Sequence, residues 1–183
     1  VPQVKFAGLL AEVPESVRTG TVLKPEQSSD SRGVFYLFGA DHIRSVQHAI
    51  SHPHWSAMVD AIEVELGAGF VHDERWQVQE LIYEDEDATP ARDLKFYTFY
   101  GEIGLILEAC RHDYRQYAYF NPDRTAALGG REHEPRFVDA SLTVTDRGGV
   151  PDSYLAEVQE LSRQIPVPFM RIDYLNGVDG LVF

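Results

Sequence analysis

A lysine followed by a loop of hydroxyl side chains stands near the start of the chain. Lys24 belongs to the apolar segment Val22-Leu23-Lys24-Pro25, and the polar loop Ser28-Ser29-Asp30-Ser31-Arg32-Gly33 follows. An ammonium group neutralises phosphate charge, while loop N–H and hydroxyl groups donate hydrogen bonds to phosphate oxygens. The pattern fits a triphosphate site, although a solvated hairpin tip is the commoner meaning of such a loop. A P-loop is excluded, because the sequence has no G-x-x-x-x-G-K-[ST] motif.

An arginine and an aspartate are spaced two residues apart in the segment Arg171-Ile172-Asp173-Tyr174. On a strand, residues i and i+2 face the same side, so Arg171 and Asp173 are predicted to project together. Such a pair is either a structural ion pair or an anion-binding arginine beside a carboxylate that binds Mg²⁺. The residues alone leave both alternatives open.

Four other groups suit chemistry, but each has a plainer alternative. The segment Gln79–Ile82 runs from a strand into a loop and could present its backbone to an adenine edge, or be an ordinary strand end. His48 and His52 have zinc-ligand spacing on a helix, but nothing nearby completes a tetrahedral set, which favours a polar helix face. Cys110 is either an activated thiol or, preferably, a buried strand residue. The acidic run Glu84–Asp87 is read as a solvated loop.

The elements that must hold these residues mix strands and helices without a regular βαβ order. The pattern predicts strands at residues 21–23, 34–38, 76–82, 94–99, 103–110 and 114–119, and a C-terminal hairpin of residues 169–175 and 181–183. It predicts helices from Asp41 to about Ile50, from 56 to 66, and from 152 to 164. Residues 121–135 are expected to be irregular. This mixture indicates an α+β fold with mostly antiparallel sheet.

Composition limits the class of protein. The 183 residues suffice for about one domain or two small lobes. Sixteen Lys and Arg against 29 Asp and Glu leave a formal charge of −13, which argues against a general nucleic-acid binder and against docking on an anionic membrane. No apolar run approaches the roughly 20 residues of a membrane-spanning helix, and no signal peptide is recognisable. The single cysteine, Cys110, fits a reducing compartment such as the cytoplasm.

Four segments, taken together and in order, resemble the ATP-grasp superfamily, most closely its TupA-like branch of teichuronopeptide and capsular polysaccharide biosynthesis type. The segments are residues 22–33, Gln79–Ile82, Asp93–Gly101, and Met170–Tyr174 followed by Asp179-Gly180. The resemblance implies a two-lobed α+β fold whose mostly antiparallel sheets clamp ATP. The first lobe would span residues 1–79 and the second residues 80–183. Because the chain ends on strand-like sequence at Phe183, we expect the second lobe to be incomplete at its C-terminus.

The resemblance also implies a role for each matched residue. The residues implied to contact ATP are Lys24 at the phosphates, Ser28, Ser29, Arg32 and Gly33 in the phosphate-covering loop, Glu80 and Leu81 at the adenine hinge, and Asp93 and Lys95 near the ribose or substrate. Arg171 would lie near the transferred phosphate as a catalytic residue. Asp173 would bind Mg²⁺, and the family's second metal-binding carboxylate would follow the final hairpin, beyond Phe183.

The resemblance makes an ATP-dependent ligase domain the leading functional expectation. It would use ATP and Mg²⁺ to activate a carboxylate as an acylphosphate and pass the acyl group to an amine, with a small molecule or a precursor of a cell-surface polymer as substrate. The alternative is a non-catalytic nucleotide-binding or interaction module of the same fold, because the second carboxylate is absent from the sequence. A third alternative is an α+β protein that binds no nucleotide.

Overall fold

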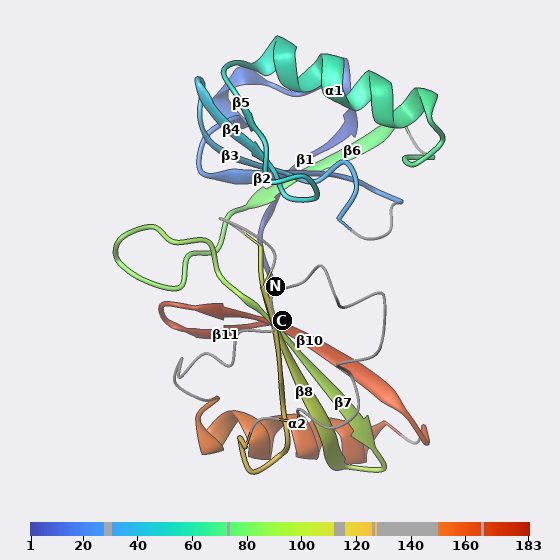
Figure 1. Cartoon of the computed structure of the whole chain (residues 1–183), viewed down its shortest axis with the longest axis vertical. Coiled ribbons are helices and arrows are strands. Elements are labelled where there is room, and N and C mark those ends of the chain that lie inside the picture. The colour runs from blue at the N-terminus through green and yellow to red at the C-terminus, as the bar shows by residue number, and fades with distance from the viewer. Residues whose placement is uncertain (28–30, 73, 112–115, 126, 128–149, 166) are drawn as a thin grey trace. The chain divides into compact units, whose positions relative to one another are not determined.

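The computed structural model describes residues 1–27, 31–72, 74–111, 116–125, 127, 150–165 and 167–183. The chain forms two compact units, Val1–Ile82 and Tyr83–Phe183. Each unit is built on one antiparallel sheet with an α-helix (Figure 1). The predicted α+β class with antiparallel sheets is confirmed. The resemblance implies a division between residues 79 and 80, and the boundary between the two units falls between Ile82 and Tyr83.

The first unit contains a six-stranded sheet in the order β1-β6-β2-β3-β4-β5. Its strands are β1 (Val4–Leu9), β2 (Thr21–Pro25), β3 (Phe35–Gly39), β4 (His42–Ser45), β5 (Ser51–His52) and β6 (Arg75–Glu80). Two short 3₁₀ helices, Leu10–Glu12 and Glu15–Val17, connect β1 to β2. The hairpin predicted around the polar loop is confirmed, since β2 pairs antiparallel with β3.

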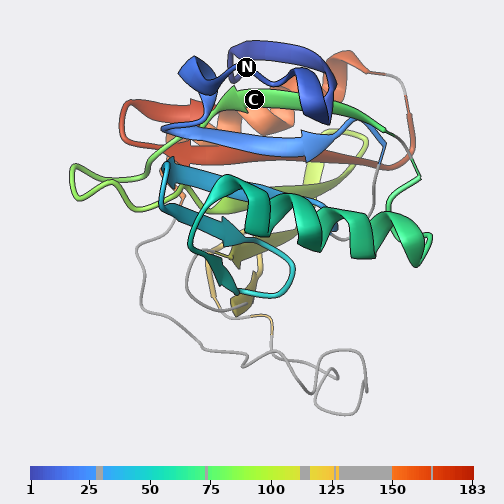
Figure 2. The same ribbon diagram turned by 90° about the horizontal axis from the view of Figure 1, so that it is seen from above.

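Helix α1 (Trp55–Gly67) covers one face of this sheet (Figures 1 and 2). The His54 ring accepts a hydrogen bond from the Ala57 N–H at 3.2 Å and so caps the first turn. Met58 and Ile62, four residues apart on one side of α1, are fully buried against Leu23 and Trp76. The alternation of strand residues puts Leu23, Leu37 and Trp76 in the core under α1 and Lys24, Tyr36 and Gln77 on the other face.

The second unit contains a five-stranded sheet in the order β11-β10-β7-β8-β9. Its strands are β7 (Asp93–Phe99), β8 (Glu102–Cys110), β9 (Gln116–Phe120), β10 (Met170–Gly177) and β11 (Gly180–Val182). Helix α2 (Asp152–Gln164) buries Val158 against Phe96, Ile106 and Ile172 of this sheet. The predicted helix 152–164 and the predicted strands of β7 and β8 are confirmed.

The predicted helix from Asp41 to Ile50 is wrong. These residues form β4, a turn, and the approach to β5. Ile43 and Val46 fit a strand followed by a turn as well as a helix face, and pairing of Leu37 with Ile43 across the β3–β4 hairpin decides for the strand. His48 and His52 therefore do not share a helix face. His48 Nε2 lies 2.7 Å from Glu65 Oε1, and the His52 ring packs edge-on against Phe35.

Other differences concern element ends and one missed strand. β6 ends at Glu80 rather than residue 82, and β10 and β11 extend to Gly177 and Gly180, which shortens the turn between them. β1 was not predicted, because most of Val4–Leu9 is exposed and shows little alternation. β9 spans Gln116–Phe120, within the predicted strand 114–119 and one residue beyond it. Residues 114 and 115 and most of the predicted loop 121–135 lie outside the described residues.

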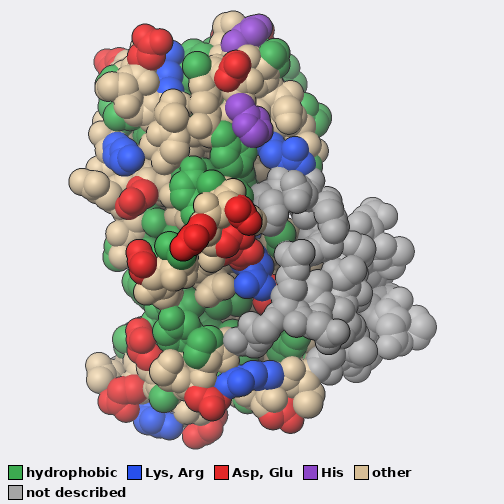
Figure 3. All heavy atoms as spheres, turned by 90° about the vertical axis from the view of Figure 1, so that its left-hand side faces the viewer, with side chains coloured by type: hydrophobic (Ala, Val, Ile, Leu, Met, Phe, Trp, Pro, Cys, Tyr) green, Lys and Arg blue, Asp and Glu red, His purple; other side chains and the backbone are tan. Residues whose placement is uncertain are grey.

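Acidic and basic side chains are interspersed with apolar ones on the face that Figure 3 shows. Among the described helices, none is long and apolar enough to cross a membrane.

Candidate functional site

One face of the second sheet carries a cluster of charged side chains, which we call the charged face. Its members are Asp93 and Lys95 of β7, Arg111 after β8, and Arg171 and Asp173 of β10. Strand alternation positions them, because the residues between them on β7 and β10, such as Leu94 and Ile172, point into the core.

The β7–β10 register brings the opposite charges into contact. Asp173 pairs directly with Lys95 across the strands, and Lys95 Nζ donates to Asp173 Oδ2 at 3.0 Å. Arg171 adds a bidentate contact, from Nε to Oδ1 at 2.7 Å and from Nη2 to Oδ2 at 2.9 Å. At the other end of the cluster, Asp93 Oδ2 lies 3.5 Å from Lys95 Nζ and 3.2 Å from Arg111 Nη1.

Counted over the described residues, the charged face holds three basic and two acidic side chains, an excess of one positive charge in a chain of formal charge −13. Partial burial would raise the pKa of Asp173, but the hydrogen bonds and positive charges of Arg171 and Lys95 outweigh it and lower that pKa below its ordinary value. The bond to Asp173 raises the pKa of Arg171. An anionic group fits this local excess of cations.

The structure brings together the four second-unit residues that the sequence analysis proposed: Asp93, Lys95, Arg171 and Asp173. It adds Arg111, which the sequence analysis did not assign to the site. A signal for Arg111 was available, because a hairpin centred near Gly101 pairs Asp93 with Ala109 and so sets Arg111 beside Asp93.

Lys24 lies in the first unit, on the sheet face opposite α1. Its neighbours on β2, Leu23 and Pro25, are buried, whereas the Lys24 side chain is half-buried, beside its cross-strand partner Gln77. Burial lowers the pKa of the Lys24 ammonium. Within the described part of the chain this ammonium makes no hydrogen bond or ion pair, so it is a cation that a ligand phosphate can neutralise.

Two of the four predicted loop residues, Arg32 and Gly33, are described, while Ser28 and Ser29 lie outside the described residues. Arg32 Nη1 lies 3.5 Å from Glu65 Oε2 of α1, and its guanidinium stacks 3.9 Å above the Phe70 ring. Gly33 has a φ of +69°, and a Cβ there would lie 3.0 Å from Val71 Cγ2. The structure thus anchors the C-terminal end of the loop beside the C-terminal end of α1.

Glu80 and Leu81, the predicted adenine hinge, lie at the end of the first sheet. The Glu80 N–H donates to the Gln3 carbonyl at 2.9 Å and the Leu81 N–H donates to the Gly20 carbonyl at 3.2 Å. The side chain of Leu81 is buried and that of Glu80 is exposed. Both N–H groups are therefore engaged within the unit.

A family model decides the relationship of the chain to known proteins. The model of the TupA-like ATPgrasp family matches residues 14–183. The chain belongs to this family. The match includes Lys24 and every residue of the charged face, and it agrees with the resemblance seen in the sequence.

The other two comparisons of the TupA-like ATPgrasp chain give either no match or a weak one. No curated protein matches it. The structure of the ATP-grasp ligase PsnB complexed with minimal precursor is similar, with a TM-score of 0.40 and 14% sequence identity. The alignment covers 98% of this chain and 43% of that one, so the chain spans less than half the length of this relative.

The described residues do not by themselves make a magnesium site in this TupA-like ATPgrasp chain. Both carboxylate oxygens of Asp173 already accept hydrogen bonds from Arg171 and Lys95. In the part of the chain that the structure describes, no group of three or more His, Cys, Asp or Glu side chains is placed to hold a metal ion. The arrangement is that of an ion-pair network with an exposed arginine, and the Mg²⁺ role of Asp173 stays a prediction.

Proposed function

We propose that this chain is the nucleotide-binding part of an ATP-dependent ligase that activates a carboxylate. The observation that carries the proposal is the family match over residues 14–183, which includes all the residues proposed to bind ATP. The charged face supports it, because an excess of one positive charge on a strongly acidic chain suits a ligand with phosphate or carboxylate groups.

The proposed reaction has two steps. A carboxylate oxygen of the acyl donor attacks the γ-phosphorus of ATP, ADP leaves, and an acylphosphate forms. An amine then attacks the acyl carbon, inorganic phosphate leaves, and the nitrogen loses a proton to solvent, which yields an amide. Catalysis of such transfers depends mainly on positioning and on neutralising phosphate charge.

In this proposal, basic side chains make most of the contacts to the phosphates of ATP. Lys24 would contact the phosphates from the first unit, with Arg32 and Gly33 at the end of the covering loop. Arg171, which is exposed, would meet the transferred phosphoryl group, while Asp173 holds its guanidinium in one orientation. Lys95 and Asp93 would contact the ribose or the acyl substrate. The acceptor amine and a cell-surface polymer precursor rest on the family resemblance alone, and the expected cytoplasmic location rests on the single cysteine, Cys110.

A non-catalytic nucleotide-binding module is the second candidate, and one observation favours it. Among the described residues, Asp173 is the one carboxylate at the predicted metal position, and Arg171 and Lys95 already bind both of its oxygens. A module of this kind would bind ATP and leave it intact.

Trapping with hydroxylamine separates the two candidates. Hydroxylamine attacks an acylphosphate to give a stable hydroxamate, so the purified protein is incubated with Mg²⁺-ATP, hydroxylamine and a mixture of carboxylic acids. The ligase predicts ADP and hydroxamate, whereas the module predicts a rise in melting temperature with ATP and neither product. No rise in melting temperature and no product would contradict both.

A matched pair of arginine variants makes the assignment specific. Arg171→Gln should lower the rate of hydroxamate formation about a hundredfold, the effect of losing one donor to a developing charge. Arg163→Gln is the control, because Arg163 is an exposed arginine of the same unit that pairs with Glu160 of α2, away from the charged face. Equal rates in both variants would remove Arg171 from the site.

A further inference from the structure

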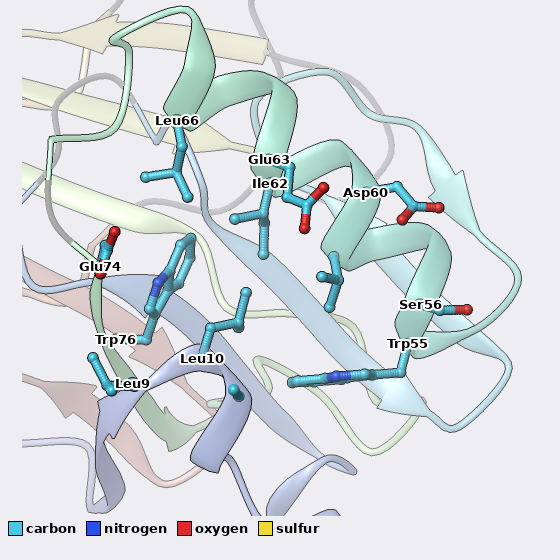
Figure 4. Close-up of a pocket in the computed structure, with 12 residues that line it drawn as sticks. Leu9, Leu10, Trp55, Ser56, Asp60, Ile62, Glu63, Leu66, Glu74 and Trp76 are labelled. Carbon is cyan, nitrogen blue, oxygen red and sulfur yellow. The ribbon is translucent and has the colours of Figure 1, made fainter.

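The first unit contains a concave site apart from the candidate-site residues discussed above, which we call the α1 groove. It is an open cavity of about 570 Å³ between α1, the end of β1, the first 3₁₀ helix and β6 (Figure 4). Its apolar lining comes mainly from Leu9, Leu10, Trp55, Ile62, Leu66 and Trp76. Figure 4 shows Ile62 and Leu66 pointing from α1 toward Leu10 and Trp76. A volume of this size is within the range of ligand sites.

The α1 groove is separate from the proposed ATP site. It lies on the face of the first sheet that α1 covers, since Trp76 at its floor is fully buried in the core beneath α1. The next residue of β6, Gln77, projects to the opposite face and pairs with Lys24. A ligand in the groove would therefore leave Lys24 untouched, and the inference does not depend on the proposed function.

The polar part of the lining has one sign of charge. Asp60 and Glu63, one helical turn apart on α1, and Glu74, just before β6, are exposed and line the cavity. None of these carboxylates forms an ion pair with another described residue. Among the described residues that line the groove, none is basic. The guanidinium of Arg18 stacks 3.9 Å above a ring of Trp55, but it also donates to the Val13 carbonyl at 2.6 Å.

We propose that the α1 groove binds a basic amphipathic helix of a protein partner, with its apolar side chains on the groove floor and its Lys or Arg side chains on the acidic rim. Charge complementarity selects this occupant. Figure 4 shows Glu74 and Asp60 at opposite ends of the cavity, an arrangement that suits several cationic side chains spaced along a helix better than a single amine. Leu9 and Leu10 supply apolar surface that such a helix would cover.

The chain carries its own reporter for this test. Its two tryptophans, Trp55 and Trp76, both line the groove; Trp76 is fully buried, so the partly exposed Trp55 is the residue whose emission a bound peptide should change. The whole protein is titrated with three synthetic helical peptides of about 14 residues: one of Leu and Lys at helical spacing, one with Glu for Lys, and one with Ser for Leu. Only the Leu-Lys peptide should change the tryptophan emission, and added salt should weaken its binding.

Charge-neutral variants test whether the acidic residues that line the groove contribute to peptide binding. The triple variant Asp60→Asn, Glu63→Gln, Glu74→Gln should bind the Leu-Lys peptide about three- to thirtyfold more weakly, as expected for the loss of three exposed ion pairs. The matched control is Glu86→Gln, Asp87→Asn, Glu102→Gln, which removes the same charge from exposed positions of the second unit and should leave the affinity unchanged. Circular dichroism confirms that both triple variants are folded.

Four outcomes would overturn the proposal: no fluorescence change with the Leu-Lys peptide, equal binding of the Leu-Glu peptide, equal loss of affinity in the two triple variants, or a concentration-dependent fluorescence change without peptide. The last outcome, together with a dimer in sedimentation, would assign the groove to a second copy of the chain.

Discussion

Lys95 and Asp173 face each other directly across β7 and β10, with 3.0 Å between Nζ and Oδ2, although 78 residues separate them in the chain. Arg171, which is on β10 with Asp173, donates hydrogen bonds to the same carboxylate. Asp173 thus joins the two strands electrostatically as well as through the backbone, and it orients the guanidinium that we propose meets the transferred phosphate.

The Asp173 network predicts a specific dependence of stability on acid. Because the folded-state pKa of Asp173 lies below its ordinary value of 3.8, its contribution is fully present above that value and is lost as the pH falls through the lower folded pKa. Urea unfolding should therefore show Asp173→Asn less stable than wild type at pH 6, with the difference shrinking below pH of about 4. Asp179→Asn, in the exposed β10–β11 turn, should follow the wild-type curve. A difference for Asp173→Asn that is constant down to pH of about 2 would contradict the network.

Lys24→Met should weaken ATP binding at least about tenfold, because it removes a charge-assisted contact to phosphate while keeping the length of the side chain. Isothermal titration calorimetry measures the affinity. Lys5→Met is the control, since Lys5 is exposed on β1 of the same sheet. Unchanged affinity in the Lys24 variant would exclude its proposed role.

Gly33→Ala should destabilise the first unit by about 1 to 3 kcal/mol, because φ is positive there and a Cβ would crowd Val71. Gly67→Ala at the end of α1 is the matched substitution, since a Cβ at Gly67 meets nothing within 4 Å. It should be neutral or stabilising by up to about 1 kcal/mol. Denaturant unfolding distinguishes them, and equal effects would refute the crowding argument.

Arg92→Met should destabilise the second unit by about 3 to 5 kcal/mol, because it leaves two nearly buried carboxylates without their cation. Arg92 lies 2.5 Å from Glu84 and 2.7 Å from Glu108, and each of the three side chains is only 11 or 12% exposed.

Arg75→Met is the comparison for Arg92→Met. It breaks an ion pair with Glu26 in which Arg75 is 56% exposed, and it should cost no more than about 1 kcal/mol. A similar loss for the two variants would mean that burial of the Arg92 cluster has little energetic weight.

The sequence pattern was enough to predict those features that depend on residues close together in the chain. The stripe of Leu155, Val158 and Leu161 predicted α2, and the i, i+2 spacing predicted that Arg171 and Asp173 project together; both are confirmed. The ordered segments also carried the family resemblance, and the family match agrees with it. These features are encoded locally, because backbone periodicity alone sets which side chains share a face.

Tertiary structure decided the features that depend on pairing between distant segments. The apolar residues Ile43 and Val46 fit a helix face as well as a strand followed by a turn, and only pairing with β3 makes residues 42–45 a strand. Similarly, Lys95 meets Asp173, and Arg111 meets Asp93, through the registers of β10 and β8 on β7. The sequence by itself determined the family and the residue types of the candidate site. The contacts within that site, and the α1 groove, arise only when sheet register and helix packing bring together residues that are far apart along the chain.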